Sequence, residues 1–244
     1  MKNNYVFISG GTTEIGEELI KKFSKDYNII FSYCNSKSKS EKIIKKYRKY
    51  NSIESIRIDL LKKKTINKFE TYINKKKIKI QFFIHLANLH FQRNEITKIK
   101  TKIFSDHILA NCLGSFALTQ KVIKNMKRNL KLDKFVYFIS SQSVDYGGNM
   151  LSPYVASKGF LNSLSLSLSK ELGKYNIKVN TIVLGKFFSK SFKKNFKKNK
   201  IKDLISDIPL SRLGESKDVS NLIYSLSQNN SYLSGAKIKI TGGR

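Results

Sequence analysis

The sequence predicts an α/β fold, a single Rossmann-like, doubly wound domain in which a seven-stranded parallel sheet is flanked by helices. Short runs rich in β-branched and aromatic residues alternate with longer stretches of helical periodicity. This alternation is typical of a parallel sheet with helices on both faces. The 244 residues are enough for one sizeable core, and no stretch reads as a linker or as a repeat of another. We therefore expect residues 1–244 to form one domain.

The elements follow one another in a regular order. The strand candidates are residues 5–9, 28–33, 54–58, 80–86, 134–140, 177–183 and 236–240. Helical stretches fill most of the intervals, at residues 15–25, 38–50, 62–76, 101–129, 153–173 and 216–228. Seven strands in this order favour a doubly wound sheet, in which ligands bind at the carboxyl edge of the strands.

One segment, NSLSLSLSKEL at residues 162–172, fits two patterns. Its alternation of leucine and serine is typical of a half-buried strand, whereas Leu161, Leu164, Leu168 and Leu172 fall on one helical stripe. We interpret the segment as a helix because it is long and lies between two better strand candidates. The small serines would let a second helix approach closely, which favours a subunit contact at this helix.

Composition narrows the location and chemistry of the protein. The first strand candidate begins almost at the first residue, which leaves no room for a signal peptide, and no apolar run approaches membrane-spanning length. We therefore expect a cytoplasmic protein. Cys34 and Cys112 lie in unrelated contexts, so we expect two buried, reduced thiols. We expect no metal, because the histidines form no ligand pattern: His85, His90 and His107.

The formal net charge of +30 is typical of proteins that bind nucleic acid. However, the basic residues are overwhelmingly lysine, with only six arginines, and Asn and Ile are abundant. We interpret this profile as an AT-rich coding bias acting on exposed positions, and the charge as a solvated lysine surface. A nucleic-acid site is the less favoured interpretation.

A glycine-rich stretch, SGGTTEIG at residues 9–16, lies between the first strand and the first helix. In dinucleotide-binding loops the first glycine permits a tight turn, the middle one lets the backbone approach the pyrophosphate, and the last allows close helix packing. Gly10 and Gly16 can fill the outer roles, whereas Glu14 occupies the middle position. A carboxylate aimed at the pyrophosphate would repel it. We favour the alternative, in which the Glu14 side chain turns to solvent.

The strongest chemical signal is SPYVASKGF, which places Tyr154 and Lys158 four residues apart on one face of a helix. A nearby ammonium favours phenolate and so lowers the pKa of a tyrosine, as a general acid serving a carbonyl requires. The strand KFVYFISS ends in Ser141, thirteen residues before Tyr154. Asn111 lies in the middle of a long helix, an unfavourable place unless its amide has a partner.

With these residues in this order, the chain resembles the classical short-chain dehydrogenase/reductase family over nearly its whole length. The C-terminal PLSRLGESKDVSNLIYSLSQNNSYLSGAKIKITGG is similar to the ending of the bacterial 3-oxoacyl-acyl-carrier-protein reductases. The resemblance implies that Tyr154 protonates the substrate carbonyl oxygen as hydride arrives from the nicotinamide. It implies that Lys158 holds the nicotinamide ribose and lowers the Tyr154 pKa, that Ser141 orients the same oxygen, and that Asn111 anchors a proton-relaying water.

The resemblance also implies the residues that hold cofactor and substrate. The expected cofactor-binding residues are Gly10, Gly11, Thr12, Thr13, Ile15, Gly16, Asn35, Ser36, Asp59, Leu60, Leu86, Asn88, Tyr154, Lys158, Gly185, Phe187 and Ser189. The expected substrate-binding residues are Ser141, Gln142 and Tyr154.

Two further positions depart from the family pattern. The family's Asn-Asn-Ala-Gly after the fourth strand is here HLAN, residues 85–88. We expect Asn88 to preserve a left-handed turn, Leu86 to lose the family's amide contact, and His85 to be a packed or hydrogen-bonded core residue. Leu184 replaces the family's proline before Gly185, which should soften the turn and leave function intact.

The end of the second strand bears on the choice of cofactor. NAD-preferring relatives place an acidic residue there, but FSYCNSKSKS contains none before Glu41. Asn35, Ser36 and Lys37 could instead bind a 2′-phosphate, so we expect NADPH rather than NADH. Thr13 stands where a basic residue is usual in the glycine loop, which weakens this inference.

Residues 186–208 correspond to the family's substrate lid. Phe188, Phe192 and Phe196 repeat every four residues and would give a helix an aromatic face with a lysine-covered back. This face could pack on the core, enclose an acyl chain or rest on a membrane surface. In the second case the lid lysines would meet an acidic carrier protein together with Lys127, Arg128 and Lys131.

We therefore expect an NADPH-dependent ketoreductase, most similar to 3-oxoacyl-acyl-carrier-protein reductase and assembled as a homotetramer. One alternative is a reductase of the same family acting on a sugar, a pterin or another small carbonyl compound, including a polyketide. A second is a catalytically silent Rossmann binding protein, which Glu14 and Leu86 favour.

Overall fold

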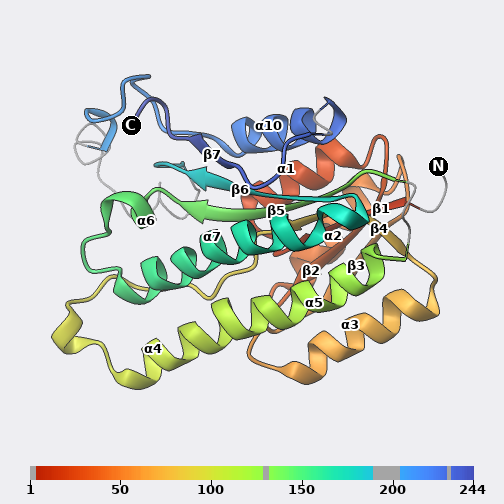
Figure 1. The fold of residues 1–244 in the computed structure, drawn as a ribbon, viewed down its shortest axis with the longest axis horizontal. Helices are drawn as coiled ribbons and strands as arrows, with labels where there is room; N and C mark the ends of the chain where they lie inside the picture. The colour runs from red at the N-terminus through yellow and green to blue at the C-terminus, as the bar shows by residue number, and fades with distance from the viewer. Residues whose placement is uncertain (1–3, 129–131, 189–203, 230–231) are drawn as a thin grey trace.

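The computed structural model describes residues 4–128, 132–188, 204–229 and 232–244. Seven parallel strands form one sheet in the order β3-β2-β1-β4-β5-β6-β7, with helices on both of its faces (Figure 1). The strands are β1 (Asn4–Ser9), β2 (Asn28–Tyr33), β3 (Ile53–Arg57), β4 (Lys79–His85), β5 (Lys134–Ser141), β6 (Ile177–Leu184) and β7 (Lys237–Ile240). The predicted doubly wound, seven-stranded Rossmann-like fold is confirmed, and each predicted strand lies within one residue of the observed one.

Helices follow the strands in alternation. They are α1 (Glu14–Phe23), α2 (Lys37–Tyr47), α3 (Lys63–Lys75), α4 (Thr101–His107), α5 (Ser115–Met126), α6 (Ser143–Tyr146), α7 (Ser152–Leu172) and α10 (Ser216–Asn229). The other described helical segments are two short 3₁₀ turns, η1 (Ile96–Lys98) and η3 (Gly173–Tyr175), and the π-helical segment η2 (Ile108–Gly114). The helical interpretation of residues 162–172 is confirmed by α7.

The helix predicted at residues 101–129 differs from the expectation in one respect. Residues 108–114 form η2, a π-helical segment between α4 and α5. At its end Gly114 passes so close to the loop after β3 that a Cβ atom would lie 2.2 Å from the Leu60 carbonyl oxygen. Sequence periodicity does not report such a contact, and π segments are frequent at functional sites.

Two apolar cores lie on the two faces of the sheet. One is formed with α3, α5 and α7 and includes Phe69, Leu118 and Leu161; the other is formed with α1, α2 and α10 and includes Leu19, Ile43 and Val219. The central strands β1, β4 and β5 are mostly buried on both faces, which explains why they appear in the sequence as nearly continuous apolar runs. Within the described residues, no helix is both long and apolar enough to cross a membrane.

The strand order reverses between β1 and β4. From β1 the chain builds the sheet outward to β3, and it then returns to β4 on the other side of β1. The carboxyl ends of β1 and β4 diverge at such a switch point and leave a crevice there. Ser9, His85 and Ser141 end the three central strands β1, β4 and β5 at this edge.

Candidate active site

The glycine loop joins β1 to α1 with almost no space for side chains. Gly10 has φ +71°, and a Cβ atom there would lie 3.0 Å from the Ala87 nitrogen. A Cβ on Gly11 would lie 2.6 Å from the Phe31 ring, and one on Gly16 would lie 2.7 Å from the Gly10 oxygen. These close approaches require glycine.

Thr13 fixes the start of α1. Its hydroxyl donates to the Gly10 oxygen at 2.9 Å and accepts from the Gly16 nitrogen at 3.0 Å, which makes it the N-cap. Glu14 is the first residue of the helix and is half-buried. The loop therefore turns into the helix without a middle glycine.

A groove of about 590 Å³ runs along the carboxyl edge from the glycine loop. It is lined by Gly10, Thr12, Thr13, Ser32, Tyr33, Cys34, Asn35, Ser36, Ile58, Asp59, Leu60, Leu61, Leu86, Ala87, Asn88, Leu89, His90 and Ala110. Nine of the expected cofactor residues are in this set: Gly10, Thr12, Thr13, Asn35, Ser36, Asp59, Leu60, Leu86 and Asn88. Glu14 is not in it, and the helix dipole favours a carboxylate in the first turn.

Tyr154 and Ser141 bring two hydroxyls together beyond the end of β5. Ser141 is its last residue, and its Oγ accepts a hydrogen bond from the Ser143 nitrogen at 3.2 Å. Burial raises the pKa of Tyr154 above its usual value, and the hydrogen bond between Tyr154 and Ser141 opposes part of that rise. The phenol is therefore protonated throughout the neutral pH range and able to donate.

Lys158 lies one helical turn after Tyr154 and is buried beneath it. Its Nζ donates to the Ile139 carbonyl oxygen at 2.9 Å and lies 5.7 Å from the centre of the Tyr154 ring. Burial lowers the pKa of Lys158 to about 8. The pKa of Tyr154 is thus raised rather than lowered toward neutral pH as predicted, because burial dominates and the Lys158 ammonium faces a backbone carbonyl.

Asn111 lies in the π segment with its amide engaged on both sides, as its mid-helix position predicts. Its Oδ1 accepts from the Leu89 nitrogen at 2.6 Å, and its Nδ2 lies 3.2 Å from His107 Nδ1 and 3.4 Å from Ser157 Oγ. Ser157 lies between Tyr154 and Lys158 on α7. Asn111 thus connects the groove wall to α7, the helix that carries Tyr154 and Lys158.

His85 is a fully buried hydrogen-bonded residue, as predicted. Its Nδ1 lies 2.8 Å from Ser9 Oγ, and its Nε2 lies 2.9 Å from Ser115 Oγ. Burial, together with the charge of Lys158, lowers the pKa of His85 to about 3, so the imidazole is neutral.

The left-handed turn predicted at Asn88 is wrong. Asn88 is not among the described residues that have a positive φ. The segment is instead held by side-chain acceptors: Ser9 Oγ accepts from the Leu86 and Ala87 nitrogens, both at 3.1 Å, and Asn111 Oδ1 accepts from the Leu89 nitrogen. Side-chain acceptors thus hold the backbone of this segment in place at the point where a turn was predicted.

Residues 185–188, which we call the strap, follow β6 and include Gly185 and Phe187. Phe187 pairs with Gly214, and the Phe188 nitrogen donates to the Gly214 oxygen at 2.8 Å. A Cβ on Gly214 would lie 2.7 Å from the Phe187 ring, so this glycine admits the strap. Ser189, Phe192, Phe196 and Lys131 lie outside the described residues.

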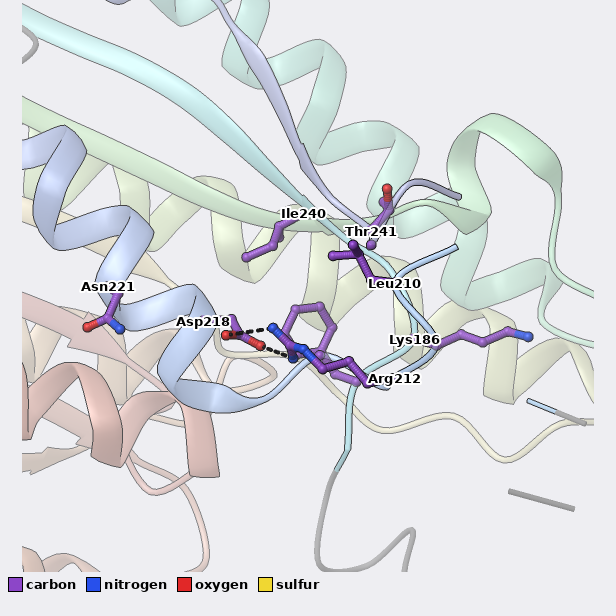
Figure 2. Close-up of a pocket in the computed structure, with 10 residues that line it drawn as sticks. Lys186, Leu210, Arg212, Asp218, Asn221, Ile240 and Thr241 are labelled. Atoms are coloured by element: carbon purple, nitrogen blue, oxygen red, sulfur yellow. Dashed lines mark hydrogen bonds and ion pairs between the residues drawn. The ribbon is translucent and has the colours of Figure 1, made fainter. Parts of the chain in front are cut away.

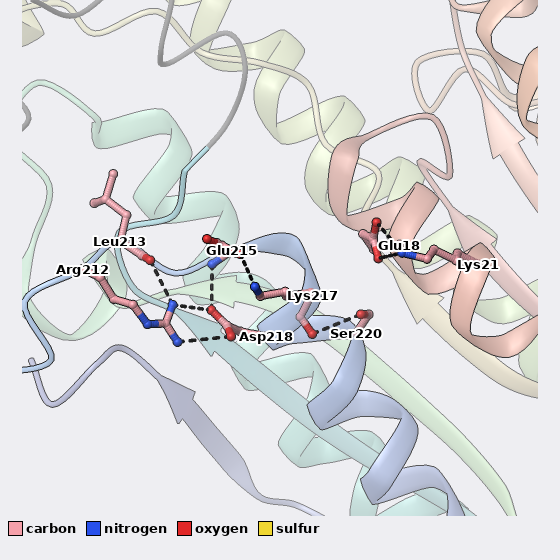
Figure 3. Close-up of polar contacts among 8 residues, drawn as sticks. All are labelled: Glu18, Lys21, Arg212, Leu213, Glu215, Lys217, Asp218 and Ser220. Atoms are coloured by element: carbon pink, nitrogen blue, oxygen red, sulfur yellow. Dashed lines mark hydrogen bonds and ion pairs between the residues drawn. The ribbon is translucent and has the colours of Figure 1, made fainter.

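A second pocket, of about 290 Å³, lies behind this strap (Figure 2). Lys186, Arg212, Asp218 and Thr241 are among its lining residues. Arg212 and Asp218 form an ion pair at 2.7 Å, and Asp218 also accepts from the Glu215 nitrogen at 2.8 Å, which caps α10 (Figure 3). Arg212 and Asp218 therefore stabilise the start of α10, whereas Lys186 pairs with Asp207 at 2.7 Å.

Comparison with known proteins identifies the family. The family model described as Enoyl-(Acyl carrier protein) reductase matches residues 12–244. The chain belongs to the short-chain dehydrogenase/reductase family. It is therefore an oxidoreductase acting on CH–OH groups.

Curated relatives cover nearly the full length. The 3-oxoacyl-[acyl-carrier-protein] reductase FabG of Buchnera aphidicola is 27% identical over 97% of this chain and 95% of its own length. The L-rhamnose 1-dehydrogenase (NADP(+)) of Thermoplasma acidophilum is 24% identical over 99% of this chain and 96% of its own length.

Solved structures share the fold. The Pseudomonas aeruginosa RhlG/NADP active-site complex has a TM-score of 0.90 at 19% identity and covers 100% of this chain and 96% of its own. A glucose/ribitol dehydrogenase from Brucella melitensis has a TM-score of 0.89 at 19% identity and covers 100% of this chain and 97% of its own.

Sequence reasoning missed three residues that the structure places at this short-chain dehydrogenase/reductase site. Ser9 and Ser115 flank His85. Arg57 ends β3 beside Tyr33 and donates from Nε to the Cys34 oxygen at 3.1 Å, next to the groove. None of the three carried a sequence signal of its own, because each acts through a contact between segments that are distant in the chain. Cys34, predicted to be buried, is exposed at the groove, whereas Cys112 is buried.

Proposed function

We propose that this protein reduces a ketone carbonyl to an alcohol with NADPH as the hydride donor, in one catalytic domain. The observation that carries the proposal is the pair of interacting hydroxyls, Ser141 and Tyr154, above the buried Lys158. The groove from the glycine loop extends to Ala110, next to Asn111, whose amide touches the same helix.

The groove fits a dinucleotide. Gly10 and Gly11 leave no Cβ atoms where the backbone must be approached, and the N-terminus of α1 offers the positive end of its dipole to a pyrophosphate. Asp59 and Leu60 line the groove on the side of β3, where an adenine would lie. The nicotinamide supplies a hydride, and the protein supplies orientation and the proton.

The residues divide the remaining work. The carbonyl oxygen gains the electron pair displaced by hydride addition at carbon, and Tyr154 donates its phenolic proton to that oxygen. Ser141 donates a second hydrogen bond that fixes the direction of the carbonyl, and the adjacent Gln142 is assigned to substrate binding. The cationic Lys158 stabilises the phenolate that remains and binds the nicotinamide ribose. Asn111 anchors the water through which the proton is replaced.

NADPH is favoured over NADH by the charges at the end of β2. Asn35 and Ser36 line the groove and carry no acidic group. Arg57 lies beside them, and Lys37 begins α2. A 2′-phosphate would therefore meet cations, whereas the ribose hydroxyls of NADH would meet no carboxylate from β2.

The substrate proposed is the 3-oxoacyl thioester of an acyl carrier protein, as in fatty-acid elongation. The FabG relatives of Buchnera aphidicola and Staphylococcus epidermidis, 27% and 25% identical, support this class. A sugar is the second candidate, because the rhamnose dehydrogenase is similar over a comparable length.

Two of the predicted carrier-binding cations, Lys127 and Arg128, lie toward the opposite end of β5 from Ser141 within one chain. Lys127 pairs with Glu171 at 3.6 Å, and Arg128 donates to Asn74 Oδ1 at 2.9 Å, both near the amino end of β5. Ser141 is at its carboxyl end. Within one chain, therefore, these two cations do not border the proposed catalytic hydroxyls.

We propose a homotetramer. Large apolar side chains are exposed along one stretch of the α4–η2–α5 helix: Ile103, Phe104, Leu109, Leu113 and Phe116. Leu166 of the neighbouring α7 is 54% exposed. An apolar surface of this kind is typical of a protein–protein contact.

The first experiment is a fluorescence titration of the purified protein with NADPH and NADH, followed by initial rates on a panel of substrates. The panel contains a 3-oxoacyl thioester, a 2-enoyl thioester and L-rhamnose with NADP⁺. We expect tighter binding of NADPH and turnover of the 3-oxoacyl thioester. Binding of neither cofactor would contradict the proposed function, and turnover of rhamnose alone would move it to the second candidate.

A further inference from the structure

Three elements of the proposed site meet at the buried His85 imidazole. Ser9 ends β1 and leads into the glycine loop, His85 ends β4, and Ser115 begins α5 directly after the π segment that carries Asn111. The Ser9–His85 and His85–Ser115 distances are 2.8 and 2.9 Å. These contacts join the two walls of the crevice to the helix behind it.

The hydrogen-bond partners determine the imidazole tautomer. Ser9 Oγ already accepts from the Leu86 and Ala87 nitrogens, so its own proton is free to point at His85 Nδ1. Nδ1 is then the acceptor, and Nε2–H donates to Ser115 Oγ. A protonated imidazole would donate from both nitrogens and turn the Ser9 hydroxyl away from this arrangement.

The contacts reach the groove through the backbone. Leu86 and Ala87 line the groove, and the Ala87 nitrogen lies where Gly10 approaches most closely. Asn111 holds the Leu89 nitrogen on the other side of this turn. Ser9 and Asn111 thus set the position of the backbone at residues 86–89 relative to the glycine loop. His85 in turn sets the orientation of the Ser9 hydroxyl.

We propose that His85 is a positioning residue for the dinucleotide: through Ser9 it holds the Leu86–Ala87 turn against the glycine loop. This inference rests on the proposed function. It assigns the histidine, which stands where the family has asparagine, a role in cofactor affinity in addition to packing.

The test compares dissociation constants for NADPH, measured by fluorescence, in four variants. His85→Leu removes both polar contacts and should weaken binding at least tenfold. His85→Gln keeps one acceptor and one donor with similar reach and should stay within threefold of the wild type. Ser9→Ala should weaken binding at least tenfold, and adding His85→Leu to it should change the constant less than twofold, because both act through the same turn.

Asn125→Leu is the matched control. Asn125 Oδ1 accepts from the Ile80 nitrogen at 3.0 Å, and its Nδ2 donates to the Ile78 oxygen at 2.9 Å, so it anchors the amino end of the same strand. It is buried and does not line the groove. We expect a fall in melting temperature comparable to that of His85→Leu, with the NADPH dissociation constant within twofold of the wild type.

The outcomes separate the two proposals. A wild-type protein that binds no NADPH would overturn the proposed function and this inference with it. If the wild type binds and His85→Leu binds equally well, only the positioning role is overturned. Equal weakening by Asn125→Leu would also overturn it, because general destabilisation would then account for the effect. If His85→Leu does not fold, the other two variants test the positioning role. Ser9→Ala should then weaken NADPH binding at least tenfold, and His85→Gln should keep the dissociation constant within threefold of the wild type.

Discussion

The sequence predicts that Lys158 controls the protonation of Tyr154, whereas in the structure burial controls it. Burial keeps the phenol protonated, and the buried ammonium lies beneath it with a backbone carbonyl as its partner. In the proposed mechanism, burial therefore keeps Tyr154 protonated as the donor. The Lys158 ammonium stabilises the negative charge that forms on Tyr154 when the proton leaves.

Replacing Tyr154 by Phe should lower kcat by about 10³-fold or more, because the proton donor is lost while the ring remains. NADPH affinity should change less than threefold, as measured by fluorescence titration. Ser143→Ala is a suitable control, since it alters a neighbour of Ser141 and leaves the phenol in place. Reduction that survives Tyr154→Phe would remove Tyr154 from the mechanism.

The pKa of Lys158 predicts the alkaline limit of activity. With a pKa of about 8, the fraction of cationic Lys158 falls as pH rises above about 8. The ratio kcat/KM should therefore fall about tenfold per pH unit well above that value. Lys158→Arg should be slower but should lose this alkaline limb, because a guanidinium stays charged. A wild-type profile flat to pH 10 would contradict the assignment.

Lys158 also imposes a cost on stability. Its pKa is lowered from 10.5 to about 8, a difference equivalent to about 3 kcal/mol. Between pH 8 and 10.5 the unfolded chain binds more protons than the folded one, so this contribution makes stability rise with pH. Lys158→Met should abolish turnover and yet melt at or above the wild-type temperature at pH 7, as calorimetry would show. A large fall in melting temperature would contradict it.

At the scale of elements, the π segment and its glycine set one wall of the groove. Gly114 touches Leu60, which lines the groove, and Asn111 of the same segment holds Leu89. One tight packing contact therefore controls the distance between the α4–η2–α5 helix and the loop after β3.

Gly114→Ala should destabilise the protein by about 1–3 kcal/mol, because the added methyl would overlap the Leu60 carbonyl. NADPH should also bind more weakly. Gly173→Ala is the matched control, since its Cβ meets nothing within 4 Å and its φ is −54°. Chemical denaturation and cofactor titration of both variants would check this, and equal effects would contradict the packing argument.

At the scale of the molecule, the exposed apolar side chains of the α4–η2–α5 helix predict self-association. Leu113 is 59% exposed at its centre. Light scattering should give four times the chain mass for the wild type, and Leu113→Glu should reduce the mass by placing a charge in the contact. Leu210→Glu, which alters an equally exposed leucine elsewhere, should not. A monomeric wild type would contradict the proposed tetramer.

The net charge of +30 predicts a salt effect specific to an acidic partner. Turnover of a carrier-linked 3-oxoacyl substrate should fall several-fold between low and physiological salt, because the attraction is screened. Turnover of a small thioester with the same acyl group should change little at saturating NADPH. The same salt response for both substrates would contradict carrier recognition by the lysines.

The sequence by itself determined the strands, most helices, the sheet class and the order of Asn111, Ser141, Tyr154 and Lys158. These depend on the period of apolar residues and on short spacings along one helix or strand, which are local properties. The tertiary structure decided the π segment, the backbone at Asn88, the direction of the Tyr154 pKa shift and the contacts of His85. Each depends on groups separated by many residues in the chain, as Ser9, His85 and Ser115 are, and no local pattern reports which of them become buried together.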